Sequence, residues 1–215
     1  CVTFAMLVTS APAVADGNKI YLTQASPSHG NHTGNTINVD QSGADFSLIG
    51  LEHDPATQEG RGNSADILAQ GYGSAILLRQ QNNSVNGNIA SLYTYGNVDA
   101  ALKQAGEQNA ATLRVMGPGM TGQILQDGNL NQGTLNAIGV RGAATLEQIG
   151  SNIDATLNVE AYYGQVNYTL EGMNVRFANQ GPTVRTFGQT INIRQSAIGF
   201  DGPGNGNGNG GGNQN

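Results

Sequence analysis

Histidine and acidic side chains are the residues of this sequence best suited to bind a metal or to transfer protons. His29 and His32 are three residues apart in a Gly- and Asn-rich stretch, a spacing that could hold a metal loosely. We favour a solvated loop for both, and His53 also lies outside the repeats of the chain. Asp99, Asp127 and Asp154 fall in turn-like positions of separate repeats, whereas parallel β-helix lyases and hydrolases cluster such groups in a groove. We therefore expect no enzyme, no metal and no cofactor.

Cysteine chemistry is confined to the start of the chain. Cys1 is the only cysteine and lies in an apolar run, residues 1–15, that ends in the small residues Ala13, Val14 and Ala15. This run is typical of a truncated secretory signal peptide and is short of the ~20 residues needed to span a bilayer. The mature chain is then expected to begin near Asp16, without a thiol for disulfides or zinc, and without stable membrane insertion.

Neutral amides supply most of the polarity. The 215 residues include 25 Asn, 17 Gln and 32 Gly, while charged residues make up 11% and the net charge is −6. Nine scattered Lys and Arg form no basic stripe, which argues against a nucleic-acid partner. Side-chain amides can hydrogen-bond to copies of themselves, so this composition fits either an aggregation-prone disordered chain or an ordered cross-β or solenoid array. Periodicity distinguishes the two.

A repeat of 22 residues runs through the second half of the chain. Glycines recur in one column, and a glutamine stands two residues before each of the first three. The glycine column contains Gly106, Gly128, Gly150 and Gly172. The position two residues before each glycine holds Gln104, Gln126, Gln148 and then Leu170. The glycines are typical of tight corners, and the stacked glutamines are expected to pass an amide hydrogen bond from one repeat to the next.

Apolar residues follow the same frame and alternate with polar ones. Leu102, Ile124, Leu146 and Tyr168 form one column, and Leu113, Leu135 and Leu157 form another 11 residues later. Alternation at period two predicts strands with one buried face. Turn signals separate them, such as the segment 106–108 and Gly117, Pro118 and Gly119. A strand–turn–strand–turn unit predicts an all-β fold, a β-solenoid in which two parallel sheets stack.

The flanking regions fit the frame less well and suggest four parts. These are a signal peptide (1–15), an N-terminal secretion-targeting segment with irregular strands (16–62), a repeat solenoid (63–200) and a disordered Gly- and Asn-rich tail (201–215). Residues 36–43, TINVDQSG, carry the same order at Ile37, Val39, Gln41 and Gly43, which indicates an irregular flanking coil. The segment 50–62 is interpreted as a loop. Upstream, Leu78 and Gln80 repeat the pattern after a slip of two residues.

The repeats resemble those of the curlin family. QAGEQNAATL, from Gln104, and QDGNLNQGTL, from Gln126, are similar to the curlin-associated repeat Gln-x-Gly-x-x-Asn-x-Ala, with Asn109 and Asn131 in the Asn position. The third repeat has Ile153 there, and the fourth keeps only Gly172. The resemblance covers roughly residues 63–198. It implies an exported subunit of extracellular amyloid fibres that polymerises with itself and a companion curlin after passing an outer-membrane pore, and that serves adhesion and biofilm matrix.

Two other functions remain open. A monomeric secreted β-solenoid adhesin or carbohydrate-binding protein would present an exposed groove, to which Tyr93, Tyr95, Tyr162, Tyr163 and Tyr168 could contribute. Surface β-formers are the simpler interpretation of these tyrosines. Thr112, Thr134 and Thr156 form an outward column reminiscent of ice-binding solenoids, but the column beside it is not threonine.

Overall fold

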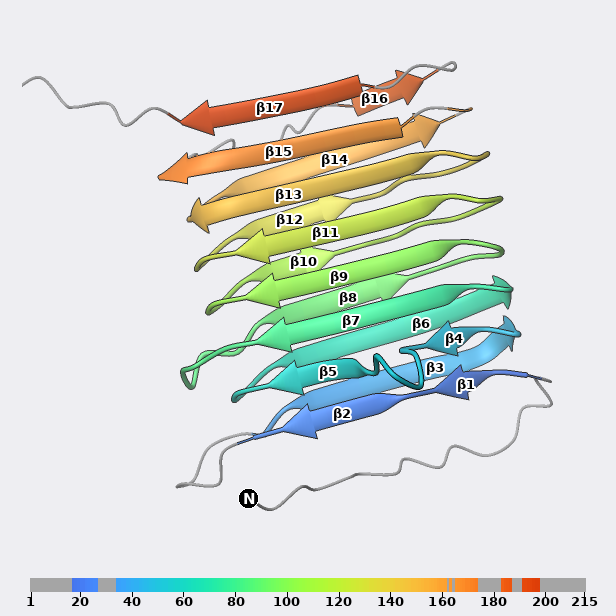
Figure 1. Ribbon diagram of the computed structural model, residues 1–215, viewed down its shortest axis with the longest axis horizontal. Coiled ribbons are helices and arrows are strands. Elements are labelled where there is room, and N and C mark those ends of the chain that lie inside the picture. Colours follow the sequence, from blue (N-terminus) through green and yellow to red (C-terminus); the bar gives the residue numbers. More distant parts are fainter. Residues whose placement is uncertain are drawn as a thin grey trace, which may run out of the picture.

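A computed structural model describes residues 17–26, 34–161, 163, 165–173, 183–186 and 191–197, and within them every regular element is a β-strand. The strands form two parallel sheets that face each other along the whole stack (Figure 1). The predicted all-β solenoid of two parallel sheets is therefore confirmed. The expected signal peptide, His29, His32, Tyr162 and the tail lie outside the described residues. None of the described segments is a helix that could cross a bilayer.

The first sheet, sheet A, is 10-stranded. Its strands are β1 (Lys19–Ile20), β2 (Leu22–Ala25), β4 (Leu48–Ile49), β5 (Ala56–Glu59), β7 (Ala75–Gln81), β9 (Asp99–Ala105), β11 (Thr121–Asp127), β13 (Ala143–Ser151), β15 (Gln165–Met173) and β17 (Ile191–Ala197). From β7 to β17 each strand pairs with the strand of the coil before it.

The second sheet, sheet B, is 7-stranded. Its strands are β3 (Thr36–Asp45), β6 (Ser64–Tyr72), β8 (Ile89–Tyr93), β10 (Ala110–Thr112), β12 (Gln132–Leu135), β14 (Asp154–Ala161) and β16 (Thr183–Thr186). The chain runs along a strand of sheet A, turns a corner, returns along sheet B and turns again. Each circuit advances one strand spacing, ~4.8 Å.

Register keeps equivalent residues of successive coils opposite one another. Gln104 pairs with Gln126, and Gln126 pairs with Gln148, at the sequence separation of 22 that the repeat predicts. The glycine column is equally regular, with Gly150 opposite Gly172. In sheet B, Ala111 lies opposite Gly133. Residues at equivalent positions of successive coils therefore stack along the solenoid axis.

The core lies between the sheets and is built by alternation along each strand. In β11 every second residue, Gly122, Ile124 and Gln126, is buried, and the residues between them face outward. The two apolar columns are 2% exposed or less; they contain Leu102, Ile124, Leu146, Tyr168, Leu113, Leu135 and Leu157. Burying each leucine or isoleucine contributes about 1.5–3 kcal/mol. This core accounts for the strict alternation in the sequence.

The N-terminal coils belong to the same two sheets, which begin at Lys19, upstream of residue 63. Residues 36–43 lie in β3 of sheet B, whereas Gln104, Gln126 and Gln148 lie in sheet A, so Gln41 does not stack with those glutamines although its segment carries the same order of residues. A register shift between Asp40 and Gly43 interrupts this strand, and Gln41 Nε2 donates to the backbone carbonyl of Ser47 at 3.2 Å. The local pattern of TINVDQSG matched the repeat, but pairing with β6 decides its sheet.

The segment 50–62 is only partly the loop that we expected. It contains β5, which pairs with β7 and places Gln58 opposite Gln80. The true loop is shorter: Leu51 and Asp54 exchange backbone hydrogen bonds of 2.8 and 3.1 Å, and Asp54 forms an ion pair with Arg79. Residues 51–54 thus form a loop between β4 and β5, and both of these strands keep their pairing with β7 in sheet A.

Candidate functional site: stacked amides and open strand edges

Five hydrogen bonds join six buried or half-buried glutamines into one column, the Gln column. The Nε2 atom of each donates to the Oε1 atom of the next, at 2.6–2.8 Å. The column contains Gln24, Gln58, Gln80, Gln104, Gln126 and Gln148. All but Gln24 are 1% exposed or less. All five bonds run in the same direction along the axis, from Gln24 to Gln148, so the column has a polarity.

Each buried glutamine also links the two sheets. Gln104 Nε2 donates to the backbone carbonyl of Ile89 at 3.0 Å, and Gln126 Nε2 does so to Ala110 at 3.0 Å. Gln148 Nε2 reaches the carbonyl of Gln132 at 2.6 Å. Both hydrogens of the Gln104 and Gln126 amides therefore have acceptors inside the core, which removes the penalty for burying them.

A second column of amides, the Asn column, secures the corner after sheet A. The Oδ1 atom of each member accepts the backbone N–H of the equivalent residue in the next coil, at 2.9–3.1 Å. Its members are Asn35, Asn63, Asn88, Asn109 and Asn131. The Nδ2 atom of Asn109 donates to the carbonyls of Ala105 and Gly128 at 3.1 and 2.8 Å. Where strand pairing ends, the side chains of the Asn column thus supply hydrogen-bond partners for the backbone N–H and C=O groups of the corner.

The glycines fit these corners for a steric reason. Gly106, Gly128 and Gly150 have φ angles of +105°, +115° and +103°. A Cβ atom on Gly106 would lie 2.0 Å from the carbonyl oxygen of Gly128, and one on Gly128 would lie 1.7 Å from that of Gly150. Successive corners therefore stack backbone on backbone, and only glycine leaves room for it.

Both amide columns are interrupted in the last coils. Leu170 stands in the register of Gln148, and Ile153 stands in the register of Asn131; both side chains are fully buried. Gln195 returns to the Gln column by backbone register, opposite Leu170. The repeat departures seen in the sequence are therefore apolar replacements inside the core.

Sequence reasoning missed the N-terminal members of both columns. Gln58 precedes Gln80 by 22 residues, so this pair carried the signal. Gln24 precedes Gln58 by 34 residues, a separation that hides it. Asn35, Asn63 and Asn88 were missed for the same reason, since 28 and 25 residues separate them.

The other candidate groups are dispersed. Asp99, Asp127 and Asp154 lie on β9, β11 and β14, and His53 is exposed in the loop before β5. No group of three metal-ligating side chains occurs in the part of the chain that the structure describes. Thr112, Thr134 and Thr156 are in register on sheet B. Of the tyrosines, Tyr168 is a core residue at 2% exposure, whereas Tyr95 and Tyr163 are 54% and 64% exposed.

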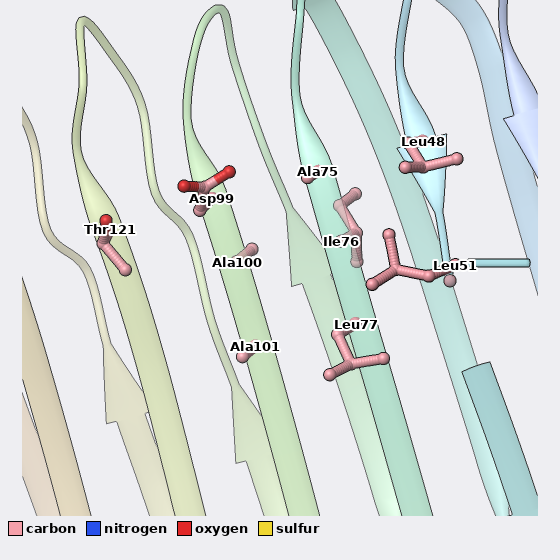
Figure 2. A pocket seen from close by; sticks show the side chains of 10 residues that line it. Leu48, Leu51, Ala75, Ile76, Leu77, Asp99, Ala100, Ala101 and Thr121 are labelled. Atoms are coloured by element: carbon pink, nitrogen blue, oxygen red, sulfur yellow. The ribbon is translucent and has the colours of Figure 1, made fainter. Parts of the chain in front are cut away.

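A small apolar hollow of about 190 Å³ lies on the outer face of sheet A (Figure 2). Leu48, Leu51 and Leu77 form its rim and Ala75 and Ala101 its floor. Asp99 is the only charged residue that lines it. A single carboxylate without a second titratable partner provides no acid–base pair.

No family model, curated protein or solved structure matches this chain.

Proposed function

We propose that this protein is a secreted structural subunit of curli-like extracellular amyloid fibres, which support cell adhesion and biofilm matrix. The observation that carries the proposal is that both ends of the described solenoid are open strand edges. Among the residues that the structure describes, β1, β2 and β3 each pair on one side only, and so do β16 and β17 at the other end. Open edges present unpaired N–H and C=O groups that a further strand can satisfy.

A second copy of the chain fits these edges in one register. Gln24 begins the Gln column in β2, and the backbone register of β17 places Gln195 in the same column. Head-to-tail addition that sets Gln24 opposite Gln195 would extend both sheets and continue the column of amides. It would also cover Ile20 and Leu22, which are 46% and 39% exposed at the N-terminal edge. The burial of apolar side chains and the new backbone bonds favour the same contact.

The remaining parts of the proposal follow from the resemblance to curlins. The fibre is then assembled outside the cell, after export through the inner membrane and an outer-membrane pore, together with a companion curlin subunit. The amide columns support this function because each rung accepts from one copy of the repeat and donates to another. A fibre of such subunits has a self-complementary core throughout its length.

Assembly kinetics test the proposal. We expect the unfolded chain, once diluted into buffer, to polymerise with a sigmoidal time course that its own seeds shorten, into fibres with a meridional reflection near ~4.8 Å. Leu22→Lys, which places a charge on the open edge, should prolong the lag. Val85→Lys is the matched control, because Val85 is 48% exposed in the loop between β7 and β8. A chain that stays monomeric at high concentration contradicts the proposal.

A further inference from the structure

Three aromatic side chains line one corner of the solenoid on successive coils. Phe46, Tyr72 and Tyr95, the aromatic corner, are 55%, 63% and 54% exposed. The rings of Phe46 and Tyr72 touch edge to face, with centroids 5.3 Å apart and planes at 60°. Tyr72 and Tyr95 belong to adjacent coils, because the N–H of Asn97 donates to the Tyr72 carbonyl. The three residues therefore belong to successive coils: the Phe46 and Tyr72 rings are in contact, and Tyr95 lies one coil further along the axis, close to the backbone of Gly71.

Glycines flank this line of rings. A Cβ atom on Gly17 would lie 2.6 Å from Cδ1 of Phe46, and one on Gly117 would lie 4.0 Å from Cδ1 of Tyr95. Larger residues at these positions would therefore press on the Phe46 ring at one end and reach the Tyr95 ring at the other. The Gly17 backbone therefore packs closely against the Phe46 ring, and the lack of a side chain at Gly117 keeps that neighbour from covering the Tyr95 ring.

The neighbouring strand end is held by polar contacts. The hydroxyl of Tyr93, two residues before Tyr95, donates to Oε1 of Gln70 at 2.8 Å. The Arg114 guanidinium lies 5.6 Å from the centroid of the Tyr93 ring. These contacts join three successive coils of sheet B next to the corner. These contacts hold the backbone just before Tyr95 in place. Less conformational entropy of this segment is therefore lost when a ligand binds to the Tyr95 ring.

The exposed area of the corner is too small for a stable contact between two protein subunits. Three aromatic side chains exposed to this extent present about 300–400 Å² together. A standard protein interface buries ~800 Å² on each partner. A corner is also convex, so a second solenoid would contact it only along a narrow strip. A linear polymer can bind through a contact surface of that width.

Charge and chemistry further narrow the class of polymer. The chain carries a net charge of −6, and Asp45 adjoins Phe46, which disfavours polyanions. Aromatic faces pack on the C–H faces of sugar rings, and tyrosine hydroxyls can bond sugar hydroxyls. The advance of ~4.8 Å per coil is close to that of one sugar unit in an extended glycan. Rings at 60° form a twisted platform, which suits one chain better than a flat crystalline surface.

We propose that the aromatic corner binds a single chain of a neutral polysaccharide. Its two main rings, Tyr72 and Tyr95, lie on coils inside the stack, whereas Phe46 follows the edge strand β3; glycan binding by these rings does not depend on fibre assembly. Tyr72 and Tyr95 provide the main stacking surfaces, and Phe46 extends the platform by one coil. Each successive ring adds contact with a further sugar unit, so affinity should rise with the length of the glycan.

Affinity electrophoresis of the freshly diluted full chain tests this proposal in native gels that contain hydroxyethylcellulose, a soluble neutral glucan. We expect the chain to be retarded, and the double variant Tyr72→Ala/Tyr95→Ala to lose at least about tenfold in affinity, because two aromatic stacking contacts are lost. Tyr72→Phe should retain binding because the ring remains. Tyr163→Ala is the matched control, since Tyr163 is 64% exposed outside the aromatic corner.

Three results would overturn the proposal. The first is an unretarded wild-type chain. The second is a double variant that is retarded like the wild type. The third is retardation that appears only with anionic carboxymethylcellulose. Polymerisation of the double variant is followed in parallel; we expect its lag to be unchanged, so that loss of glycan binding and loss of assembly can be told apart. Altered lateral bundling of its fibres with unaltered glycan binding would indicate a second copy as the occupant.

Discussion

Gln126 Nε2 donates a hydrogen bond of 2.6 Å to Gln148 Oε1, two residues that are 22 apart in the sequence and stacked in adjacent coils. The other hydrogen of the same amide bonds the Ala110 carbonyl in the opposite sheet. One side chain thus joins two coils and two sheets. The geometry explains why a buried, uncharged and self-complementary group repeats at this position.

Removal of one amide should destabilise the solenoid and slow its assembly. Gln126→Ala deprives Gln104 Nε2 of one of its two acceptors and Gln148 Oε1 of its donor, both in the core. We expect unfolding in denaturant to show a loss of about 2–4 kcal/mol, together with a longer lag. Gln123→Ala is the control, because Gln123 faces outward on the same strand. Equal effects of the two substitutions would show that the amide column has no special role.

The stacked corners should not tolerate a side chain. Gly128→Ala would combine a φ of +115° with a Cβ atom 1.7 Å from the Gly150 carbonyl oxygen. We expect a loss of more than ~3 kcal/mol in the free energy of unfolding, since backbone strain alone costs about 1–3 kcal/mol. Gly139→Ala should change stability little, because its Cβ would meet only ordinary contacts at 3.7 Å. Thermal unfolding of both variants gives the comparison.

One corner residue is a candidate for stabilisation. Leu130 has a φ of +59° and is 45% exposed, whereas the equivalent residue one coil later is Asn152, with a φ of +60°. Asparagine adopts this conformation more readily than leucine. Leu130→Asn should therefore raise the free energy of unfolding by about 0.5–1 kcal/mol. Leu130→Ala, which removes the exposed side chain without relieving the backbone, separates the two effects; a gain in both variants would point to lost apolar exposure instead.

Alkaline pH should weaken the fold through Tyr168. Burial raises the pKa of this hydroxyl above its ordinary value of 10.0. The folded chain therefore holds the proton more tightly than the unfolded chain. The stability that this difference contributes is complete below about pH 10 and is lost as the pH rises through the folded-state pKa.

The measurement is denaturant unfolding between about pH 8 and about pH 11. Tyr168→Phe should make the decline above pH 10 shallower. Tyr163→Phe should leave it unchanged, because Tyr163 is 64% exposed. Parallel curves for the wild type and Tyr168→Phe would exclude this residue as a source of the pH dependence.

The sequence predicted the coils best where the corners have constant length. From Gln104 to Gln148 each coil has 22 residues, so the period exposes the Gln column, the glycine corners and both apolar columns at once. Upstream, Gln24 and Gln58 are 34 residues apart and still share a hydrogen bond. Corner loops absorb insertions at little cost in free energy, since loop closure depends only weakly on length. In these coils the spacing of 22 residues is therefore lost from the sequence, although the strands still pair in the same register.

The aromatic corner could not be found from the period. Phe46, Tyr72 and Tyr95 are not separated by 22 residues, and only the pairing of β3 with β6 and of the Asn97 N–H with the Tyr72 carbonyl places the three residues at one corner of successive coils. The same pairing decided the sheet of residues 36–43, whose local pattern fits either sheet.

The sequence by itself determined that this chain is a β-solenoid with stacked amides, because burial on one face of a strand imposes alternation and a fixed coil imposes a period. Tertiary structure alone decided which residues of the irregular coils stack, and which side chains meet at a corner. The physical reason is that hydrogen-bond register between strands, unlike spacing along the chain, is set by pairing over a distance and is indifferent to the length of the loop between them.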